Sequence, residues 1–304
     1  MITLSIIICT YNREVLLKTC LDALIAQFPE FSQATEVIVV DNNCADGTAE
    51  MVKRLGTKLP WLKYVKEEKQ GLSNARNCGA GVARGKYLCY LDDDGKPGEK
   101  YLMWVHHVIK MRDPDIAGGP VFPYYTSKKP RWFRDEFEIR KHHHKSGFSK
   151  TCSESGGNFI IKANLLKSLG YFSPKLGMIG DKTRLGEEKA ILLNYRKTVP
   201  VESQRVFYSQ ECFIYHHVPD YKMKLSYMWK RSFFAGRSVV EIKKDGFGKV
   251  PELLGAVGKL LVNDIIPMAF LKRENDTLIQ ATNRLLVNIG KISCHVTNIF
   301  WKKT

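Results

Sequence analysis

The stretch Lys86-Tyr87-Leu88-Cys89-Tyr90-Leu91-Asp92-Asp93-Asp94 is an apolar run that ends in three consecutive carboxylates. Adjacent anions repel one another, so a fold gains no stability by placing three of them at a strand tip. Clustered carboxylate oxygens suit Mg²⁺ or Mn²⁺, which commonly bridge carboxylates to substrate phosphates. Open α/β sheets bind ligands at the carboxyl ends of their strands. The stretch therefore predicts a metal–diphosphate site; the alternative is a solvated acidic turn closed by Gly95 and Pro97.

Strand and helix patterns alternate through the first 120 residues. Four runs have the apolar character of strands in a buried parallel sheet, at 4–9, 36–40, 62–65 and 87–91. Apolar positions at helical spacing or turn signals predict helices between them, over 13–28, 46–55 and 72–83. This alternation indicates an α/β protein with a mostly parallel sheet and right-handed crossovers.

Two features of the predicted helix 72–83 bear on its packing. Ser73 is the expected N-cap. Gly79 and Gly81 each weaken a helix by about 1 kcal/mol relative to Ala, so we expect both to lie where the helix packs closely against the sheet.

The second half of the chain is less regular. Residues 124–155 have little periodicity and are long for a structureless connection, which favours a mobile functional loop. We expect a glycine-rich turn entering a strand at 155–161, a strand-like segment at 206–218 and basic helices from residue 221 onward. A helical turn is also predicted at 164–169 and a longer helix at 187–196. The predicted domains are 1–220, divided into halves 1–120 and 121–220, and a helical extension 221–304.

The formal net charge is +16, with a pI near 9.4, so the surface favours anionic partners. The charge is concentrated in two regions. Residues 125–150 carry eight Lys and Arg against three Asp and Glu, and residues 220–304 carry fifteen against seven. A basic loop at 125–150 could close over the site, exclude water and hold an anionic acceptor.

Eight scattered cysteines without a CxxC pair argue against a disulfide framework or a zinc site and fit a reducing cytosol. The opening apolar run lacks the length and basic lead of a signal peptide. The best candidate for a spanning segment, 250–271, is broken by charged residues and a proline. We therefore expect a cytoplasmic protein, with peripheral contact to the cytoplasmic face of a membrane as an extension of that hypothesis.

The loop after the first strand is Cys9-Thr10-Tyr11-Asn12-Arg13, without the GxGxxG fingerprint of a dinucleotide site. A nucleotide base could instead lie against Tyr11, with its polar edge met by Asp41, Asn42 or Asn43 at the next strand tip; the alternative for those three residues is ordinary turn chemistry. Arg76 could reach a base or a phosphate, or form a surface salt bridge.

These motifs, taken together, resemble those of family 2 glycosyltransferases, which are inverting enzymes of the GT-A fold. The resemblance covers residues 3–240 and rests on ordered segments: the first-strand loop, Val40-Asp41-Asn42-Asn43, Gly71-Leu72-Ser73-Asn74-Ala75-Arg76-Asn77, Leu91-Asp92-Asp93-Asp94, Gly156-Gly157-Asn158, Leu169-Gly170-Tyr171-Phe172 and Gly186-Glu187-Glu188. It implies an α/β fold of GT-A type, with a Rossmann-like central sheet flanked by helices and a basic helical C-terminal extension.

The resemblance also implies roles for individual residues. The nucleotide-sugar would be bound by Thr10, Tyr11, Arg13, Asp41, Asn43, Arg76, Asp92 and Asp93. The metal would be held by Asp92, Asp94 and His216. Gly157 and Asn158 would lie at the acceptor.

Glu188 occupies the position of the catalytic base, next to Glu187, where the family commonly has Glu-Asp. A glutamate at that position has one more methylene of reach. Which of the two carboxylates faces the acceptor is left open, and the alternative is that both merely lie at a helix N-terminus, where the helix dipole favours anions. His216 is preferred to His217 as a ligand. For His142-His143-His144 a solvated turn is preferred to a metal site.

The implied activity is metal-dependent transfer of a sugar, with Mn²⁺ or Mg²⁺, from a nucleotide-diphosphate sugar to a hydroxyl of a glycan or lipid-linked glycan. An anionic membrane surface is an additional expected partner, because 250–271 and 278–301 mix apolar and basic residues at near-helical spacing; the alternative is a helical appendage whose basic face lies in water. Two other hypotheses stay open, an inactive nucleotide-binding domain and a basic nucleic-acid-binding protein. Nucleic acid is not expected as a partner, because its recognition signatures are absent.

Overall fold

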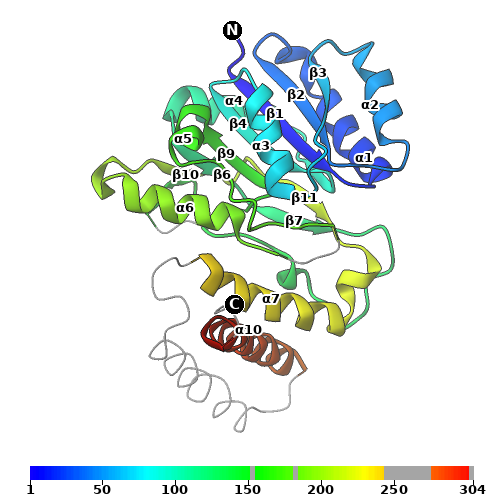
Figure 1. Cartoon of the computed structure of the whole chain (residues 1–304). Coiled ribbons are helices and arrows are strands. Elements are labelled where there is room, and N and C mark those ends of the chain that lie inside the picture. Colours follow the sequence, from blue (N-terminus) through cyan, green and yellow to red (C-terminus); the bar gives the residue numbers. More distant parts are fainter. Residues whose placement is uncertain (151–154, 181–183, 243–274, 301–304) are drawn as a thin grey trace. The chain divides into compact units, whose positions relative to one another are not determined.

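The computed structural model describes residues 1–150, 155–180, 184–242 and 275–300 (Figure 1). Its main sheet has eight strands in the order β3-β2-β1-β4-β9-β6-β10-β8. Their bounds are Leu62–Lys66, Thr35–Asp41, Leu4–Thr10, Tyr87–Asp92, Asn158–Lys162, Ile116–Gly118, Val206–Tyr208 and Gly147–Phe148. All four strands predicted in the first 120 residues are present.

The sheet is mostly parallel, as predicted. β1 pairs in parallel with β2 and β4, and β9 runs antiparallel between β4 and β6. The register sets Thr10 opposite Asp41 and Cys9 opposite Asp92. The polar residues that end these three strands therefore meet at one edge of the sheet.

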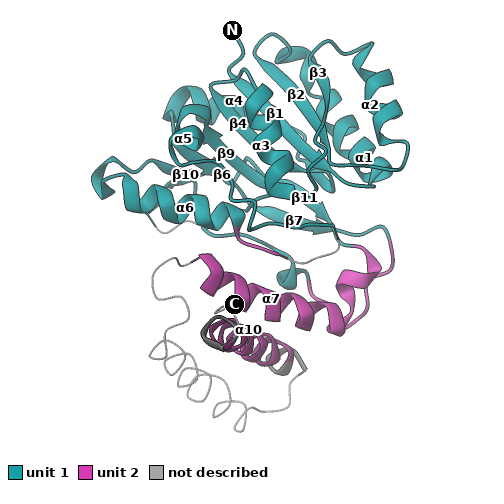
Figure 2. Ribbon diagram, viewed as in Figure 1, with its two compact units in different colours: residues 1–126, 135–180, 187–218 teal, residues 127–134, 181–186, 219–304 magenta. Residues whose placement is uncertain are grey.

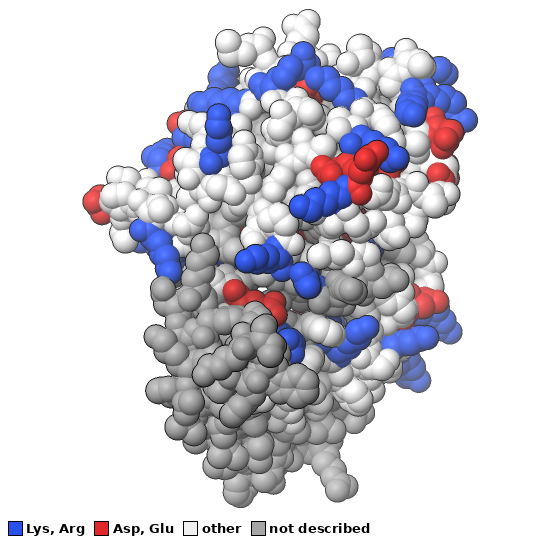
Figure 3. Space-filling view, viewed as in Figure 1, with Lys and Arg blue, Asp and Glu red and all other residues white. Residues whose placement is uncertain are grey.

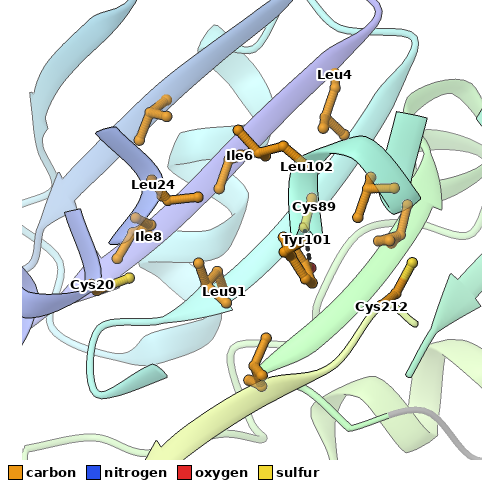
Figure 4. Close-up of a cluster of buried hydrophobic side chains, with 14 of the residues drawn as sticks. Leu4, Ile6, Ile8, Cys20, Leu24, Cys89, Leu91, Tyr101, Leu102 and Cys212 are labelled. Atoms are coloured by element: carbon orange, nitrogen blue, oxygen red, sulfur yellow. Dashed lines mark hydrogen bonds between the residues drawn. The ribbon is translucent and has the colours of Figure 1, made fainter. Parts of the chain in front are cut away.

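Helices cover both faces of the sheet. One face packs on α1 (Glu14–Ile25), α2 (Thr48–Gly56) and α4 (Tyr101–Arg112), and the other on α3 (Leu72–Val82), α5 (Ala163–Ser168) and α6 (Glu187–Thr198). Alternate residues of β1 point to opposite faces, so Ile6 and Ile8 belong to one core cluster and Ile7 to the other. Figure 4 shows the first cluster, where Cys89 and Tyr101 are hydrogen-bonded. The result is a three-layer α/β/α core.

Of three local predictions for α3, two are wrong. Ser73 lies inside α3 and donates to the carbonyl of Leu176 at 2.8 Å, while Gly71 is the N-cap. A Cβ at Gly79 would meet Ile7 and Val40, as expected for close packing on the sheet, but a Cβ at Gly81 would meet nothing within 4 Å. Gly81 therefore makes no such contact.

The segment 206–218 forms two strands rather than one. β10 joins the main sheet, and β11 (Ile214–His217) joins a small sheet between β5 (Gly95–Pro97) and β7 (Val121–Tyr124). His216 is paired with Gly95 in this small sheet. That pairing brings the end of β11 beside the acidic tip of β4.

The segment 124–150 has more structure than its sequence predicts. It contains β8, a short 3-10 helix at Asp135–Phe137, and a backbone bridge between Arg140 and Val121. Backbone pairing anchors the segment at β8 and at Arg140, and the irregular composition of the segment does not indicate this pairing. The remaining residues of the predicted loop, 151–154, lie outside the described residues, and mobility of the loop stays a prediction.

The chain divides into two compact units, coloured in Figure 2. Unit 1 comprises 1–126, 135–180 and 187–218, and unit 2 comprises 127–134, 181–186 and 219–304. The predicted boundary at residue 220 is close to the last of these divisions, but the basic stretch 127–134 groups with the C-terminal helices. The cysteines among the described residues form no disulfide with one another.

Unit 2 contains a closely packed pair of helices, α7 (Leu225–Ile242) and α10 (Asn275–Phe300). A Cβ at Gly236 would overlap the Val287 carbonyl, and one at Gly290 would overlap the Phe233 carbonyl, so both glycines allow close backbone approach. No helix in the described part of the chain is long and apolar enough to cross a membrane. The predicted interfacial segment 250–271 and Trp301 lie outside the described residues.

A buried carboxylate ties the edge of the main sheet together. Glu36 on β2 is fully buried, and its oxygens accept hydrogen bonds from the Ser5 hydroxyl, the Lys63 ammonium, and the main chain and guanidinium of Arg84, at 2.7–3.0 Å. Burial alone would raise the pKa of Glu36, but these donors outweigh it and lower the pKa to about 2.

We predict that Glu36→Gln destabilises the fold at pH 7 by about 2–3 kcal/mol, because the amide cannot accept all of these bonds and charge-assisted bonds are lost. The folded-state pKa lies below the unfolded value of about 4.3, so the ionised carboxylate stabilises above that pH and less as pH falls toward 2. Denaturant unfolding at pH 7 and pH 3 should therefore show a smaller difference between variant and wild type at pH 3. Glu99→Gln, at an exposed position, is the control; an equal difference at both pH values would contradict the assignment.

Candidate active site

Two aspartates and a histidine form a cluster at the carboxyl edge of the sheet. One ligand atom from each of Asp92, Asp94 and His216 lies within 4.8 Å of the others. The His216 Nε2 is 3.3 Å from Asp94 Oδ1. β4 and its following turn supply the carboxylates, and β11 supplies the imidazole. The three residues predicted as metal ligands are therefore brought together.

The middle aspartate faces the loop after β1. The Asp93 carboxylate accepts a hydrogen bond from Thr10 Oγ1 at 2.8 Å and forms an ion pair with Arg13 Nη1 at 2.9 Å. Arg13 also reaches Asp94 at 3.2 Å. Burial raises the pKa of Asp93 to about 6, against the opposing charge of Arg13. Asp93 thus holds two of the predicted nucleotide-binding residues in place.

The tip of β2 carries a second carboxylate whose position is fixed. Asp41 accepts hydrogen bonds from the Cys44 main chain and from the Tyr64 hydroxyl, both at 2.7 Å. Asn43 takes a left-handed backbone with φ of 70° and donates to the Glu68 carbonyl. Tyr11, which directly follows β1 in the sequence, is 39% exposed. Sequence reasoning missed Tyr64, since nothing in its own strand pattern signals a contact with Asp41.

Arg76 is buried at the centre of a group of acids. Its guanidinium contacts Glu188 at 2.6 Å, Glu187 at 3.0 Å and Asp92 at 3.5 Å, and it donates to the Gly156 carbonyl at 3.2 Å. Only 3% of the side chain is exposed. The alternative of a surface salt bridge is therefore wrong, and its role toward a nucleotide stays a prediction.

The two glutamates at the start of α6 differ in their surroundings. The Glu187 side chain is 6% exposed and that of Glu188 16%. Burial and the neighbouring charge of Glu188 raise the pKa of Glu187 to about 8. Burial would also raise the pKa of Glu188, but the charge and hydrogen bond of Arg76 outweigh it and hold that pKa below its usual value. The two carboxyl groups therefore titrate as a pair, in which Arg76 favours the ionised form of Glu188 and the proton is favoured on Glu187.

Two glycines make room for these carboxylates. A Cβ at Gly156 would overlap the Glu188 carboxylate, and one at Gly157 would overlap that of Asp92. The next residue, Asn158, has no exposed surface; it accepts from the Tyr101 hydroxyl at 2.8 Å and donates to the Cys212 carbonyl at 2.7 Å. Both ends of the amide are engaged and the whole residue is buried, so any role of Asn158 toward an acceptor would be to position its neighbours.

The remaining histidines lie elsewhere. His217 bonds the Thr126 hydroxyl at 2.7 Å, and its main chain donates to the Asp94 carbonyl. His143 pairs with Ser149 at 2.9 Å, while His142 and His144 are exposed. Within the described residues, none of the histidines 142–144 belongs to a cluster that could hold a metal.

A Rossmann-like sheet with clustered acids at its carboxyl edge is the arrangement that the resemblance to GT-A glycosyltransferases leads us to expect. The family model "Glycosyl transferase family 2" matches residues 5–170, which is more than half of the 304 residues. The chain belongs to glycosyltransferase family 2 and is a glycosyltransferase.

Curated relatives agree with that assignment. The chain is 24% identical over 245 residues to the glucosyl-dolichyl phosphate glucuronosyltransferase of Haloferax volcanii, covering 77% of this chain and 75% of that one. It is 26% identical over 239 residues to the succinoglycan biosynthesis protein ExoM of Rhizobium meliloti, covering 76% and 72%.

Solved structures share the fold. A mannosyltransferase from Pyrobaculum calidifontis, in complex with GDP-Man and Mn²⁺, superposes with a TM-score of 0.60 at 20% identity over 99% of this chain and 88% of that one. S. aureus TarS in complex with UDP-GlcNAc gives 0.58 at 16% identity over 97% and 91%.

We predict that Gly157→Ala displaces the Asp92 carboxylate and weakens manganese-dependent binding of a nucleoside diphosphate at least ~10-fold. Isothermal titration calorimetry measures the affinity. Gly81→Ala is the matched control, because its methyl group enters open space on α3 and should stabilise the helix by up to about 1 kcal/mol. Equal affinities in the two variants would show that the Gly157 contact does not set the position of Asp92.

Proposed function

We propose that the protein transfers a sugar from a nucleotide-diphosphate sugar to a hydroxyl group, with inversion at the anomeric carbon and with a divalent cation. The observation that carries the proposal is the arrangement around Arg76. This buried guanidinium contacts Asp92, a member of the Asp92–Asp94–His216 cluster, and Glu188, an ionised carboxylate that can serve as a base. The proposed leaving-group site and the proposed base would thus be linked through one side chain.

The donor would occupy the edge formed by the tips of β1, β2 and β4. Thr10, Tyr11 and Arg13 follow β1, Asp41 and Asn43 end and follow β2, and Asp92 and Asp93 end and follow β4. The solved relatives hold GDP-Man and UDP-GlcNAc, which supports a nucleotide-diphosphate sugar as the class of donor here. Arg76 would act indirectly on this donor, through Asp92.

The side chains of the Asp92–Asp94–His216 cluster suit a divalent cation. Carboxylate oxygens bind Mg²⁺ and Mn²⁺, and the His216 imidazole favours Mn²⁺ over Mg²⁺, which prefers oxygen ligands and water. The cluster spacing of 4.8 Å allows Asp92, Asp94 and His216 to share one ion. A bound cation would act as a Lewis acid that offsets the charge developing on the departing diphosphate.

The chain's own residues would carry the proton transfer. Glu188 would accept the proton of the acceptor hydroxyl as that oxygen attacks the anomeric carbon from the face opposite the diphosphate. The carbon–oxygen bond to the diphosphate breaks as the new glycosidic bond forms, so the configuration inverts and no covalent enzyme intermediate is required. Glu187, on which the proton of the pair is favoured, would support Glu188 rather than replace it.

The acceptor class is drawn from the relatives. One acts on a dolichyl phosphate, another is a succinoglycan biosynthesis protein, and a Campylobacter jejuni relative, 36% identical over 93 residues, acts on an undecaprenol-linked glycan. We propose a glycan or lipid-linked glycan acceptor near Gly157 and Glu188. Catalysis at the cytoplasmic face of a membrane, in polysaccharide or glycoconjugate synthesis, would follow, with no role for nucleic acid.

We predict that Asp94→Asn lowers manganese-dependent donor turnover at least ~100-fold, because the cluster loses a charged ligand where leaving-group charge develops. Donor hydrolysis or transfer is screened over a panel of nucleotide sugars with Mn²⁺, Mg²⁺ or a chelator. The exposed Asp22→Asn is the control. Wild-type turnover that persists undiminished in chelator would remove the metal from the proposal.

A second prediction separates the adjacent glutamates. Glu188→Gln should lower kcat by about 10²–10⁴-fold, because the base is lost. Glu187→Gln should change kcat far less, since the amide mimics the protonated carboxyl that is favoured at Glu187. Single-turnover transfer rates at pH 7 test this, with binding of the donor as a check on folding. The reverse ranking would move the base to Glu187, and loss of binding alone would indicate a structural role for the pair.

A further inference from the structure

Unit 2 carries a strong positive charge. Its described segments, 127–134, 184–186, 219–242 and 275–300, contain twelve Lys and Arg against three Asp and Glu, a net charge of +9. The sequence shows two separate basic regions, around residue 130 and beyond residue 220. The structure places part of both in one compact unit, drawn in magenta in Figure 2.

Several of these cations lie at the surface. The exposed basic residues of these segments are Lys128, Lys129, Arg131, Arg134, Arg184, Lys224, Lys230 and Arg284. A hydrogen bond from Ser127 to Asp220 ties the segment 127–134 to the 3-10 helix Asp220–Met223, which leads into α7. In Figure 3, blue side chains lie on the lower right of the described surface, with red side chains beside them, and blue side chains also lie over the upper part of the view. Part of the positive charge of unit 2 is therefore exposed.

Large aromatic side chains are exposed in the same stretch. Trp229 on α7 is 40% exposed, and Tyr221, which precedes α7, is 47% exposed. α7 buries other residues, Met228, Gly236, Ser238 and Val240. Trp and Tyr beside Lys and Arg are the pattern of segments that lie at a bilayer interface, with rings at the level of the headgroups.

We propose that the surface formed by residues 127–131, Tyr221, Lys224, Trp229 and Lys230, the basic aromatic surface, docks on an anionic lipid bilayer. The cations would approach lipid phosphates, and the two rings would enter the headgroup layer. Charge complementarity selects this partner, because each Lys or Arg near an anionic leaflet adds to the attraction. A fluid headgroup layer also accepts scattered rings and cations without a fitted groove. The basic aromatic surface would make the membrane contact included in the proposed function. Its assignment rests on charge and exposure and does not depend on transferase activity.

The test is co-sedimentation of the full chain with vesicles of neutral phosphatidylcholine, or of the same lipid with 30% phosphatidylglycerol. The wild type should bind the anionic vesicles at least tenfold more tightly, and 0.5 M salt should abolish the difference. The variant K128E/K224E/K230E should bind the anionic vesicles at least ~10-fold more weakly. The control K58E/K100E/K110E changes net charge equally at exposed positions of unit 1 and should bind within about threefold of wild type.

A second readout concerns the ring. Lipids with brominated acyl chains should quench tryptophan fluorescence of the wild type, and Trp229→Phe should remove much of that quenching. Circular dichroism and thermal unfolding establish that every variant is folded, and donor turnover in detergent-free buffer reports separately on the proposed enzyme activity. Absence of binding by the wild type, equal losses in the two triple variants, or tighter binding of a single-stranded oligonucleotide than of anionic vesicles would each overturn the proposal.

Discussion

The site depends on one buried guanidinium. Arg76 contacts Asp92, Glu187 and Glu188, which lie 16, 111 and 112 residues further along the chain. A buried carboxylate without its cation is strongly destabilising, so these acids can be adjacent only where Arg76 offsets their charge. The ion pairs therefore do more than add stability: they fix the start of α6 against α3 and the tip of β4. Glu188, the proposed base, and Asp92, one of the proposed cation ligands, keep their relative positions because they share this partner.

The glycines beside the carboxylates leave room for a glutamate at position 188. Glu188 stands where the family commonly has Asp, and its extra methylene carries the carboxylate to the space in which a Cβ of residue 156 would lie. Gly156 leaves that space open, and its carbonyl accepts a hydrogen bond from Arg76. Gly156 thus makes room for Glu188 and also accepts a hydrogen bond from Arg76, the partner of Glu188. Gly157 does the same for Asp92, so two adjacent glycines set the separation of base and ligand.

Local patterns predicted much of this fold and little of the arrangement of its site. The apolar runs located β1 to β4, because a strand buried on both faces needs continuous apolar residues, and the polar residues just beyond them located the edge where ligands bind. Patterns within one segment carry no information about partners distant in the chain. The burial of Arg76, the contact of Tyr64 with Asp41 and the division of 206–218 between two sheets all depend on such partners. Arg76 was singled out by its motif, but only the fold reveals that its neighbours are acids.

The charge balance of the site connects its chemistry to the basic character of the chain. Asp92, Asp93, Asp94, Glu187 and Glu188 supply five carboxyl groups, and Arg13 and Arg76 supply two cations. With the proton held by Glu187, an excess of two negative charges is left, which one divalent cation would neutralise. A diphosphate approaching without that cation would meet net repulsion from these residues. The excess of +16 over the whole chain acts at longer range, raising the local concentration of anionic substrates before short-range contacts select among them.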